Sequence, residues 1–194
     1  DGIKAHPAHV EFPGKAPENA PRTGGEIAIT PSISGWHSTG LYAVAGEPIT
    51  VTIPEKYADK GYAVRIGCHS DTLYHLDKWE RAPDITRSDT LATATTTTAS
   101  AFGGLIYIEV PGRAKDDEPF TAAIKGGIAA PLFVLGKDDD AKWKEIRQRP
   151  APWAEMACDK MIIICPTEVA RQINNPTELM TFWKAVVEAQ DEVT

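Results

Sequence analysis

The stretch GGLIYIEVPG (residues 103–112) decides the fold class of this chain. Aliphatic side chains alternate in it with side chains that carry a polar group: Ile106, Ile108 and Val110 against Tyr107 and Glu109. A period of two is typical of a β-strand with one face in a core. The glycines before the run and the Pro-Gly after it are turn signals. The stretch therefore predicts a half-buried strand.

Other short runs on both sides of this stretch have strand-like patterns. PITVTIP (48–54) alternates isoleucine and valine with threonine. APLFVLG (130–136) and KMIIIC (160–165) are apolar on both faces, which predicts central strands covered on both sides. In GYAVRIGCHS (61–70), alternation predicts two faces, Tyr62, Val64, Ile66 and Cys68 on one and Arg65 and His69 on the other. We expect a mainly β protein with a β-sandwich or jelly-roll-like body.

Helical patterns lie mostly near the C-terminus. DDDAKWKEIRQRP (138–150) starts with acidic residues and ends with arginines, as the helix dipole favours, although its aspartates could also hold calcium. PTEVARQI (166–173) predicts a short helix. NPTELMTFWKAVVEAQ (175–190) is the strongest signal, because Asn175 can cap a helix and proline fits its first turn. Its apolar stripe needs a covering surface: Leu179, Phe182, Trp183, Val186 and Val187.

The chain divides by composition into three segments. Residues 1–34 are rich in proline, glycine and alanine and predict an N-terminal arm or linker, residues 35–165 the β-sandwich-like part, and residues 166–194 a helical segment. LATATTTTAS (91–100) is a low-complexity run of small and β-branched residues. It predicts an edge strand or loop with a threonine ladder, and an O-glycosylated segment is the alternative.

Charge and composition exclude several classes of partner. The 194 residues carry a formal net charge of −7 and no basic patch, which disfavours nucleic acid and anionic membrane surfaces. No apolar run approaches the roughly 20 residues that span a bilayer. The start lacks the shape of a signal peptide and is typical of a mature or trimmed product, so export stays open. The chain is therefore expected to have no transmembrane segment.

Three cysteines allow at most one internal disulfide. Cys158 and Cys165 are separated by seven residues, about 23 Å along an extended strand, which is beyond disulfide reach. A bond from Cys68 to either of them stays open.

The stretch GCHSDTLYH (67–75) gathers four side chains that can bind a metal: Cys68, His69, Asp71 and His75. A zinc site needs three or four converging ligands. Neighbouring side chains of a strand point to opposite faces, so Cys68 and His69 are not expected to share an ion. We expect a core cysteine and polar histidines here, with ligand-contacting polar residues as the alternative.

Known catalytic motifs are absent from the sequence. It contains no H-E-x-x-H, no C-x-x-C, no G-x-S-x-G and no nucleotide-binding glycine pattern. APWAEM (151–156) carries Trp153 and Glu155 after prolines. They are expected either to pack as a core plug and a salt-bridge partner or to line a cleft.

Six collinear segments between residues 38 and 190 resemble the enhancin-like metallopeptidases, a family of mucin- and glycoprotein-cleaving enzymes. They are STGLYAVAGEPITVTIPE (38–55), VRIGCHSDTL (64–73) with WERAP (79–83), AFGGLIYIEVP (101–111), AAPLFVLGKDD (129–139), RPAPWAEMACDKMIIICP (149–166) and NPTELMTFWKAV (175–186).

The resemblance implies a secreted, periplasmic or cell-surface zinc endopeptidase whose substrates are mucins or O-glycoproteins. The family's zinc ligands lie on an H-E-x-x-H helix, which is absent here, so this chain is expected to be inactive alone and to hold no zinc. We interpret it as the N-terminal half of the peptidase domain, a fragment whose partner is the missing catalytic subdomain.

No catalytic residue can be carried over from the family. Four residues beside glycine or proline are substrate-binding candidates, because sugar recognition uses aromatic faces with polar edges: Trp36, His37, Trp153 and Glu155. Two other interpretations stay open, a non-catalytic glycan- or protein-binding β-sandwich module and a connecting domain of a larger surface protein.

Overall fold

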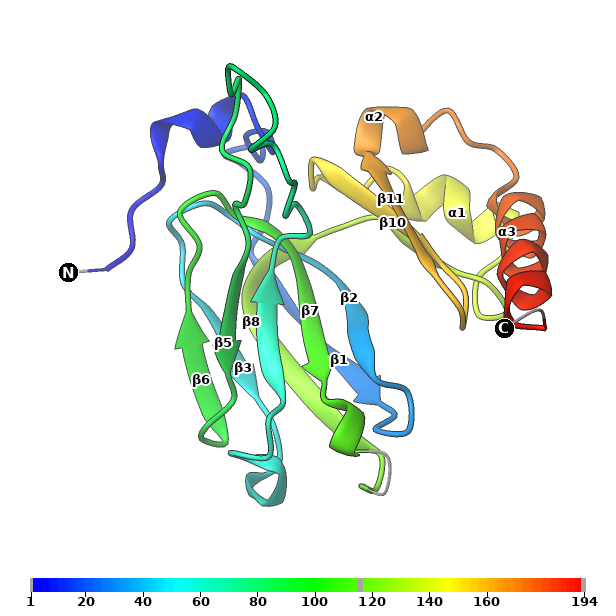
Figure 1. Ribbon diagram of the computed structural model, residues 1–194, viewed down its shortest axis with the longest axis horizontal. Helices are drawn as coiled ribbons and strands as arrows, with labels where there is room; N and C mark the ends of the chain where they lie inside the picture. Colours follow the sequence, from blue (N-terminus) through cyan, green and yellow to red (C-terminus); the bar gives the residue numbers. More distant parts are fainter. Residues whose placement is uncertain (1, 115–116, 193–194) are drawn as a thin grey trace. The chain divides into compact units, whose positions relative to one another are not determined.

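The computed structural model describes residues 2–114 and 117–192, and it divides into two compact units, Asp1–Ala129 and Ala130–Thr194 (Figure 1). The ends of the two outer predicted segments, residues 1 and 193–194, lie outside the described residues. The sequence placed boundaries after residues 34 and 165. In the structure, one strand lies before residue 34, within the segment predicted as an arm or linker. The boundary predicted after residue 165 falls inside the second unit.

The first unit is an eight-stranded antiparallel sheet in the order β5-β4-β7-β2-β8-β3-β6, with β1 paired to β8. The strands are β1 (Thr23–Ile29), β2 (Gly35–Ala43), β3 (Ile49–Thr52), β4 (Ala63–Ile66), β5 (Arg87–Thr90), β6 (Thr95–Thr98), β7 (Gly104–Val110) and β8 (Phe120–Ala129). A short 3-10 helix, η1 (Pro7–Val10), precedes β1, and two others, η2 (Glu55–Tyr57) and η3 (Gly112–Ala114), lie between β3 and β4 and between β7 and β8. The predicted mainly β body is confirmed.

Strand β7 is the stretch on which the fold prediction rested, and it lies between β2 and β4. Ile108 faces His37 of β2 and Val64 of β4 in the register of the sheet. The aliphatic residues of β7 join the main core with residues from five other strands, including Ile29, Ile49, Val51, Ile66, Ala122 and Ile124. The alternation therefore predicted the core face, but β7 is not half-buried, because Leu105 and Tyr107 on its other face are buried as well.

The start of β7 approaches the end of β4 so closely that both need glycine. A Cβ atom on Gly104, whose φ is +145°, would lie 2.5 Å from the Cα atom of Gly67. Gly67 itself has a φ of +90°, which side chains rarely allow, and β4 ends at Ile66 just before it. The predicted strand was too long, and Cys68 and His69 lie beyond it.

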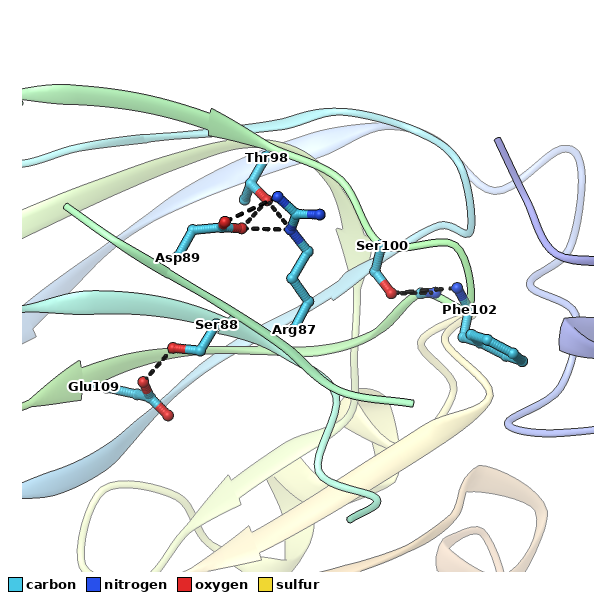
Figure 2. Close-up of polar contacts among 8 residues, drawn as sticks. Arg87, Ser88, Asp89, Thr98, Ser100, Phe102 and Glu109 are labelled. Atoms are coloured by element: carbon cyan, nitrogen blue, oxygen red, sulfur yellow. Dashed lines mark hydrogen bonds and ion pairs between the residues drawn. The ribbon is translucent and has the colours of Figure 1, made fainter. Parts of the chain in front are cut away.

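The end strands β5 and β6 are joined by side chains, a group we call the seam clasp: Arg87, Asp89 and Thr98 (Figure 2). Arg87 Nε donates to Asp89 Oδ2 at 2.6 Å and lies 3.1 Å from Thr98 Oγ1, which also donates to Asp89. These bonds connect two strands that share no backbone ladder. The predicted threonine ladder is confirmed on β6, where Thr97 lies 3.1 Å from Thr50 of β3.

The second unit contains a three-stranded sheet in the order β11-β10-β9 and three helices. The elements are β9 (Leu132–Val134), α1 (Asp140–Ile146), β10 (Trp153–Ala157), β11 (Ile162–Pro166), α2 (Thr167–Ala170) and α3 (Pro176–Asp191). The helices fall where the sequence predicted them. The prediction that 130–136 and 160–165 are central strands was wrong, because β9 and β11 are the edges and only β10 is central.

Two local predictions for the cysteines and helix ends also need correction. Cys158 and Cys165 lie in a hairpin rather than along one extended strand, since the Cys158 amide donates to the Met161 carbonyl at 2.9 Å. None of the three cysteines forms a disulfide. Asn175 makes no capping bond through its side chain, and Asp140 of α1 instead accepts from the Thr177 amide at the start of α3 at 3.0 Å.

Helix α3 presents its aromatic residues to solvent. Met180 is its buried contact with the core of the unit, which also contains Phe133, Trp143 and Met156. Phe182 is 60% exposed and Trp183 37% exposed. The predicted apolar stripe exists on the helix, but within the described residues no surface covers its aromatic part.

Candidate functional site

The first of the predicted binding residues, Trp36, lies on the outer face of the sheet in the first unit. It sits near the start of β2, directly opposite Glu109 of β7. Facing positions on paired strands project to the same side, so the two side chains share a face. Trp36 packs at 5.2 Å, centroid to centroid, on Tyr107 and stays 39% exposed. It is therefore the kind of half-open aromatic surface that a ligand can contact.

A charged residue from a third strand completes this surface. The Arg65 guanidinium of β4 lies 4.3 Å from the centroid of the Trp36 ring, a cation–π contact worth about 0.5–1 kcal/mol at partly exposed sites. Arg65 also donates to Glu109 Oε1 at 3.3 Å and to the Gly67 carbonyl at 3.1 Å. The cation–π contact and the two hydrogen bonds hold the Trp36 ring and the Arg65 guanidinium in place. Little side-chain conformational entropy is therefore lost when a ligand binds.

The carboxylate of Glu109 is held from its other side by β5. Ser88 donates its hydroxyl to Glu109 Oε2 at 2.6 Å, and Figure 2 shows the pair beside the seam clasp. We call Trp36, Arg65, Ser88 and Glu109 the Trp36 surface. An aromatic face beside a fixed carboxylate and guanidinium can hold a ring that carries hydroxyl groups. It contains no group poised to transfer a proton.

The structure does not bring His37 to the Trp36 surface. His37 faces Ile108 in the register, on the opposite side of the strand from Trp36. Its Nε2 lies 2.9 Å from the Ile33 carbonyl, so this nitrogen carries the proton and donates. His37 therefore holds the turn that leads into Trp36.

Trp153 and Glu155 belong to the second unit and lie on β10. They project to the same face, two residues apart, while Ala154 and Met156 face the core that contains Trp143. Trp153 is half-buried and Glu155 fully buried. A buried carboxylate inside a three-stranded sheet is a structural group, in contrast to the exposed ring of Trp36.

The stretch 67–75 brings two potential metal ligands together, Cys68 and His69. The Cys68 sulfur lies 3.5 Å from His69 Nδ1, and burial lowers the pKa of His69. Asp71, the nearest carboxylate in sequence, is paired with Arg81 at 2.7 Å. Within residues 2–114 and 117–192, no three His, Cys, Asp or Glu side chains are grouped to hold a metal ion. The residues present do not fit the zinc site of a peptidase.

Sequence reasoning missed Arg65, Ser88 and Glu109 as members of a site. The alternation pattern did place Arg65 and Glu109 on polar faces of their strands, which was the available signal. The register of β2, β7, β4 and β5 brings them beside Trp36. Glu109 of β7 pairs with Trp36 of β2 on one side and with Ala63 of β4 on the other. Arg65 of β4 pairs with Ser88 of β5. Register between distant strands cannot be read from one sequence.

Two family models match the chain, one after the other. The model for the N-terminal domain of M60-like peptidases matches residues 18–125, and the model for peptidase M60, enhancin and enhancin-like, matches residues 126–194. The change from one model to the other falls within a few residues of the boundary between the two compact units.

Curated relatives and solved structures agree with this assignment. The chain is 37% identical over 156 residues to TRPM8 channel-associated factor 1 of Bos taurus (79% of this chain, 17% of the relative) and 31% identical over 185 residues to TRPM8 channel-associated factor 2 of Homo sapiens (95% and 19%). It therefore spans less than a fifth of those relatives.

Among solved structures, the ZmpB metallopeptidase of Clostridium perfringens superposes with a TM-score of 0.65 at 14% identity (85% of this chain, 40% of that one). The IMPa metallopeptidase of Pseudomonas aeruginosa superposes with a TM-score of 0.64 at 19% identity (81% and 19%). These likenesses establish the shared fold. With its two collinear domain matches, the chain belongs to the enhancin-like M60 peptidase family.

Proposed function

We propose that this chain is the β-rich N-terminal portion of a zinc metallopeptidase that cleaves mucins or other O-glycosylated proteins. In this role it supplies the scaffold and one wall of the substrate cleft. The observation that carries the proposal is the collinear match to the N-terminal domain and the peptidase domain, with the change of model close to the boundary between the units. Two matching structures are described as an M60 catalytic domain with the sialyl T antigen and as IMPa with an O-glycopeptide.

The proposed division of labour leaves the chemistry outside the described residues. The residues present do not fit a zinc site, so zinc and the general base belong to the remainder of the peptidase domain. The Trp36 surface contacts the sugar of the substrate. Trp36 stacks on a pyranose ring, and Glu109 accepts hydrogen bonds from the hydroxyl groups of that ring. His37 supports the turn before Trp36, and in the second unit the half-buried Trp153 is the proposed substrate contact, whereas the buried Glu155 is structural. Such an enzyme acts where mucins are, so it is secreted, periplasmic or on the cell surface.

The experiment is a cleavage assay on the protein at its native length. Zinc content is measured first, and a mucin-type O-glycopeptide and its deglycosylated form are then compared by mass spectrometry. We expect bound zinc and cleavage that depends on the glycan. Trp36→Ala is expected to lower kcat/KM by about 3- to 10-fold, the size of one aromatic contact.

The control is Ile33→Ala, an exposed apolar side chain three residues away, which is expected to cleave as the parent does. A protein without zinc, or one that cleaves both substrates equally, contradicts the proposal.

A second candidate function is a non-catalytic binding module. It is favoured by the higher identity to the TRPM8 channel-associated factors, 31–37%, than to the solved peptidases, 14–19%. The absence of disulfides between the three cysteines is also typical of proteins in reducing compartments. In this case the partner is a membrane channel of the TRPM8 type, and the native-length protein pulls down that channel while leaving glycopeptides intact. No helix in the described part of the chain is long and apolar enough to cross a membrane.

A further inference from the structure

A second aromatic surface of the first unit lies on the segment between β4 and β5, which we call the aromatic loop (residues 70–84). Its base is held by the backbone. Ser70 and Asp84 form an isolated antiparallel bridge, and the Asp71 amide donates to the Pro83 carbonyl at 2.7 Å. Arg81 adds an ion pair to Asp71 at 2.7 Å. These contacts join the two ends of the loop to each other at its base.

The N-terminal segment supports the loop from one side. The Arg81 guanidinium lies 4.4 Å from the centroid of the Phe12 ring, and the edge of that ring packs on His69 with the centroids 4.7 Å apart. In Figure 1 the loop rises beyond β4 and β5 beside this N-terminal segment. These contacts restrain the loop near Arg81, close to its aromatic residues.

The far part of the loop exposes two aromatic rings that pack on each other. Tyr74 is 70% exposed and Trp79 48% exposed, with ring centroids 5.3 Å apart at an angle of 73°. Leu76, between them in sequence, is also exposed. Covering exposed apolar rings removes them from water and is favourable, and here the rings face solvent on a loop whose base is fixed.

The polar residues among the rings indicate what could cover them. His75, Asp77, Lys78 and Glu80 are all exposed. With histidine neutral, two carboxylates and one ammonium give this part of the loop a charge of −1, within a chain of net charge −7. An anionic lipid surface or an acidic sugar is repelled by this balance. Neutral sugar hydroxyls, in contrast, are good donors to carboxylates and match rings that stack on the apolar face of a pyranose.

We propose that the aromatic loop is a binding site for neutral saccharides, with Trp79 and Tyr74 as the stacking platform and Asp77 and Glu80 as hydroxyl acceptors. The inference deepens the proposed function, on which it rests, because it gives the glycan of the substrate a second contact away from the Trp36 surface. The loop binds sugar without taking part in cleavage.

The test is a titration of the 194-residue chain with an O-glycopeptide that carries a single N-acetylgalactosamine, followed by the chemical shifts of the Trp79 indole and by calorimetry. We expect saturable binding that shifts the Trp79 signal. Trp79→Ala is expected to weaken binding about tenfold and Tyr74→Ala about threefold. Phe182→Ala, which removes another exposed aromatic ring, is the matched control and is expected to bind as the parent does.

Three outcomes of the glycopeptide titration overturn the inference. They are no binding of the glycopeptide, equal binding of the same peptide without sugar, and unchanged affinity after Trp79→Ala in a variant with the parent melting temperature. Binding to phosphatidylcholine or phosphatidylserine vesicles that is lost on Trp79→Ala assigns the loop to a membrane instead, and also overturns it. The loop titration and the cleavage assay can fail independently. Bound zinc and glycan-dependent cleavage by the native-length protein do not require that the aromatic loop binds sugar.

Discussion

The two units of the chain differ in how completely their sheets bury aliphatic strand residues, although both expose aromatic rings. In the first unit the aliphatic faces of β3, β4 and β7 are fully buried, and polar side chains close the gap between the end strands. In the second unit all residues of the edge strand β11 are only half-buried, and Phe182 and Trp183 of α3 face solvent. The strand core of the first unit is therefore complete in itself. The second exposes the kind of surface that packs against further protein.

The comparison agrees with the family assignment. The first unit corresponds to a domain that the family model treats as a domain in its own right, and the second to residues matched by the peptidase model. The half-buried β11 and the exposed rings of α3 are compatible with the proposed role as a scaffold in a peptidase domain.

The largest effect is expected from Trp143→Ala, in the core of the second unit. Trp143 is fully buried and donates from Nε1 to the Ile173 carbonyl at 2.9 Å, so the substitution removes both packing and a hydrogen bond. We expect a loss of about 3–5 kcal/mol of unfolding free energy, seen as early melting of the second unit in calorimetry.

Trp183→Ala, in the same unit but exposed, is the control and is expected to cost less than about 0.5 kcal/mol. Both residues lie in the second unit. If both substitutions lower the melting temperature of the first unit by the same amount, the division into two units is wrong.

The next effect concerns the glycine pair in the first unit. Gly104→Ala would place a Cβ atom 2.5 Å from the Gly67 Cα atom, and backbone must move to admit it. We expect a cost of about 2–4 kcal/mol in urea unfolding, because the clash adds to an unfavourable φ. Gly112→Ala meets no atom within 4 Å and should be close to neutral. Equal stability of the two variants would show that β4 and β7 do not approach as described.

A smaller effect is expected at the seam clasp. The hydrogen bond from Arg87 lowers the pKa of Asp89, a bond from Thr98 adds to this, and burial opposes it. A lowered folded-state pKa means that the stabilisation is complete above the unfolded value of about 4 and is lost as the pH falls through the folded value.

Asp89→Asn is therefore expected to cost about 1 kcal/mol at pH 7 and progressively less as the pH falls below about 4, measured by urea unfolding across pH. Glu18→Gln, in an exposed pair with Lys15, is the control and should change nothing measurable. A pH-independent difference between Asp89→Asn and the parent would show that the clasp is not held by charge.

The smallest effect on stability is expected on α3. Phe182→Ser together with Trp183→Ser should change the unfolding free energy by less than about 0.5 kcal/mol, because both rings are exposed. The same pair should clearly reduce the binding of a hydrophobic dye and self-association in sedimentation. Ala189→Ser, exposed on the same helix, should alter neither. Dye binding that survives the double substitution would remove the evidence that this face is a packing surface.

The sequence predicted those features that depend on local periodicity. The alternation in residues 103–112 predicted β7 and its core face. The charges of residues 138–150 predicted α1, and the early proline and apolar stripe of residues 175–190 predicted α3. Strand β5, with the polar sequence RSDT, has no apolar alternation to reveal it, and β1 lies in a glycine-rich segment. Such strands are set by their pairing partners rather than by their own residues.

The candidate site shows the same limit. Trp36 could be chosen from its residue type, but its partners Arg65 and Glu109 come from strands 29 and 73 residues away in sequence and meet it only through sheet register. His37, its neighbour in sequence, points to the other face. The apolar stripe of α3 was predicted to need a partner surface, and Phe182 and Trp183 are indeed exposed. Periodicity alone shows that a stripe exists and not which of its residues are covered.

The most direct test of the account is the cleavage assay at native length, with a mucin-type O-glycopeptide and its deglycosylated form as substrates. We expect a zinc-containing protein that cleaves the glycosylated substrate in preference, with kcat/KM reduced about 3- to 10-fold by Trp36→Ala and unchanged by Ile33→Ala. Absence of zinc, or equal cleavage of the two substrates, would contradict it.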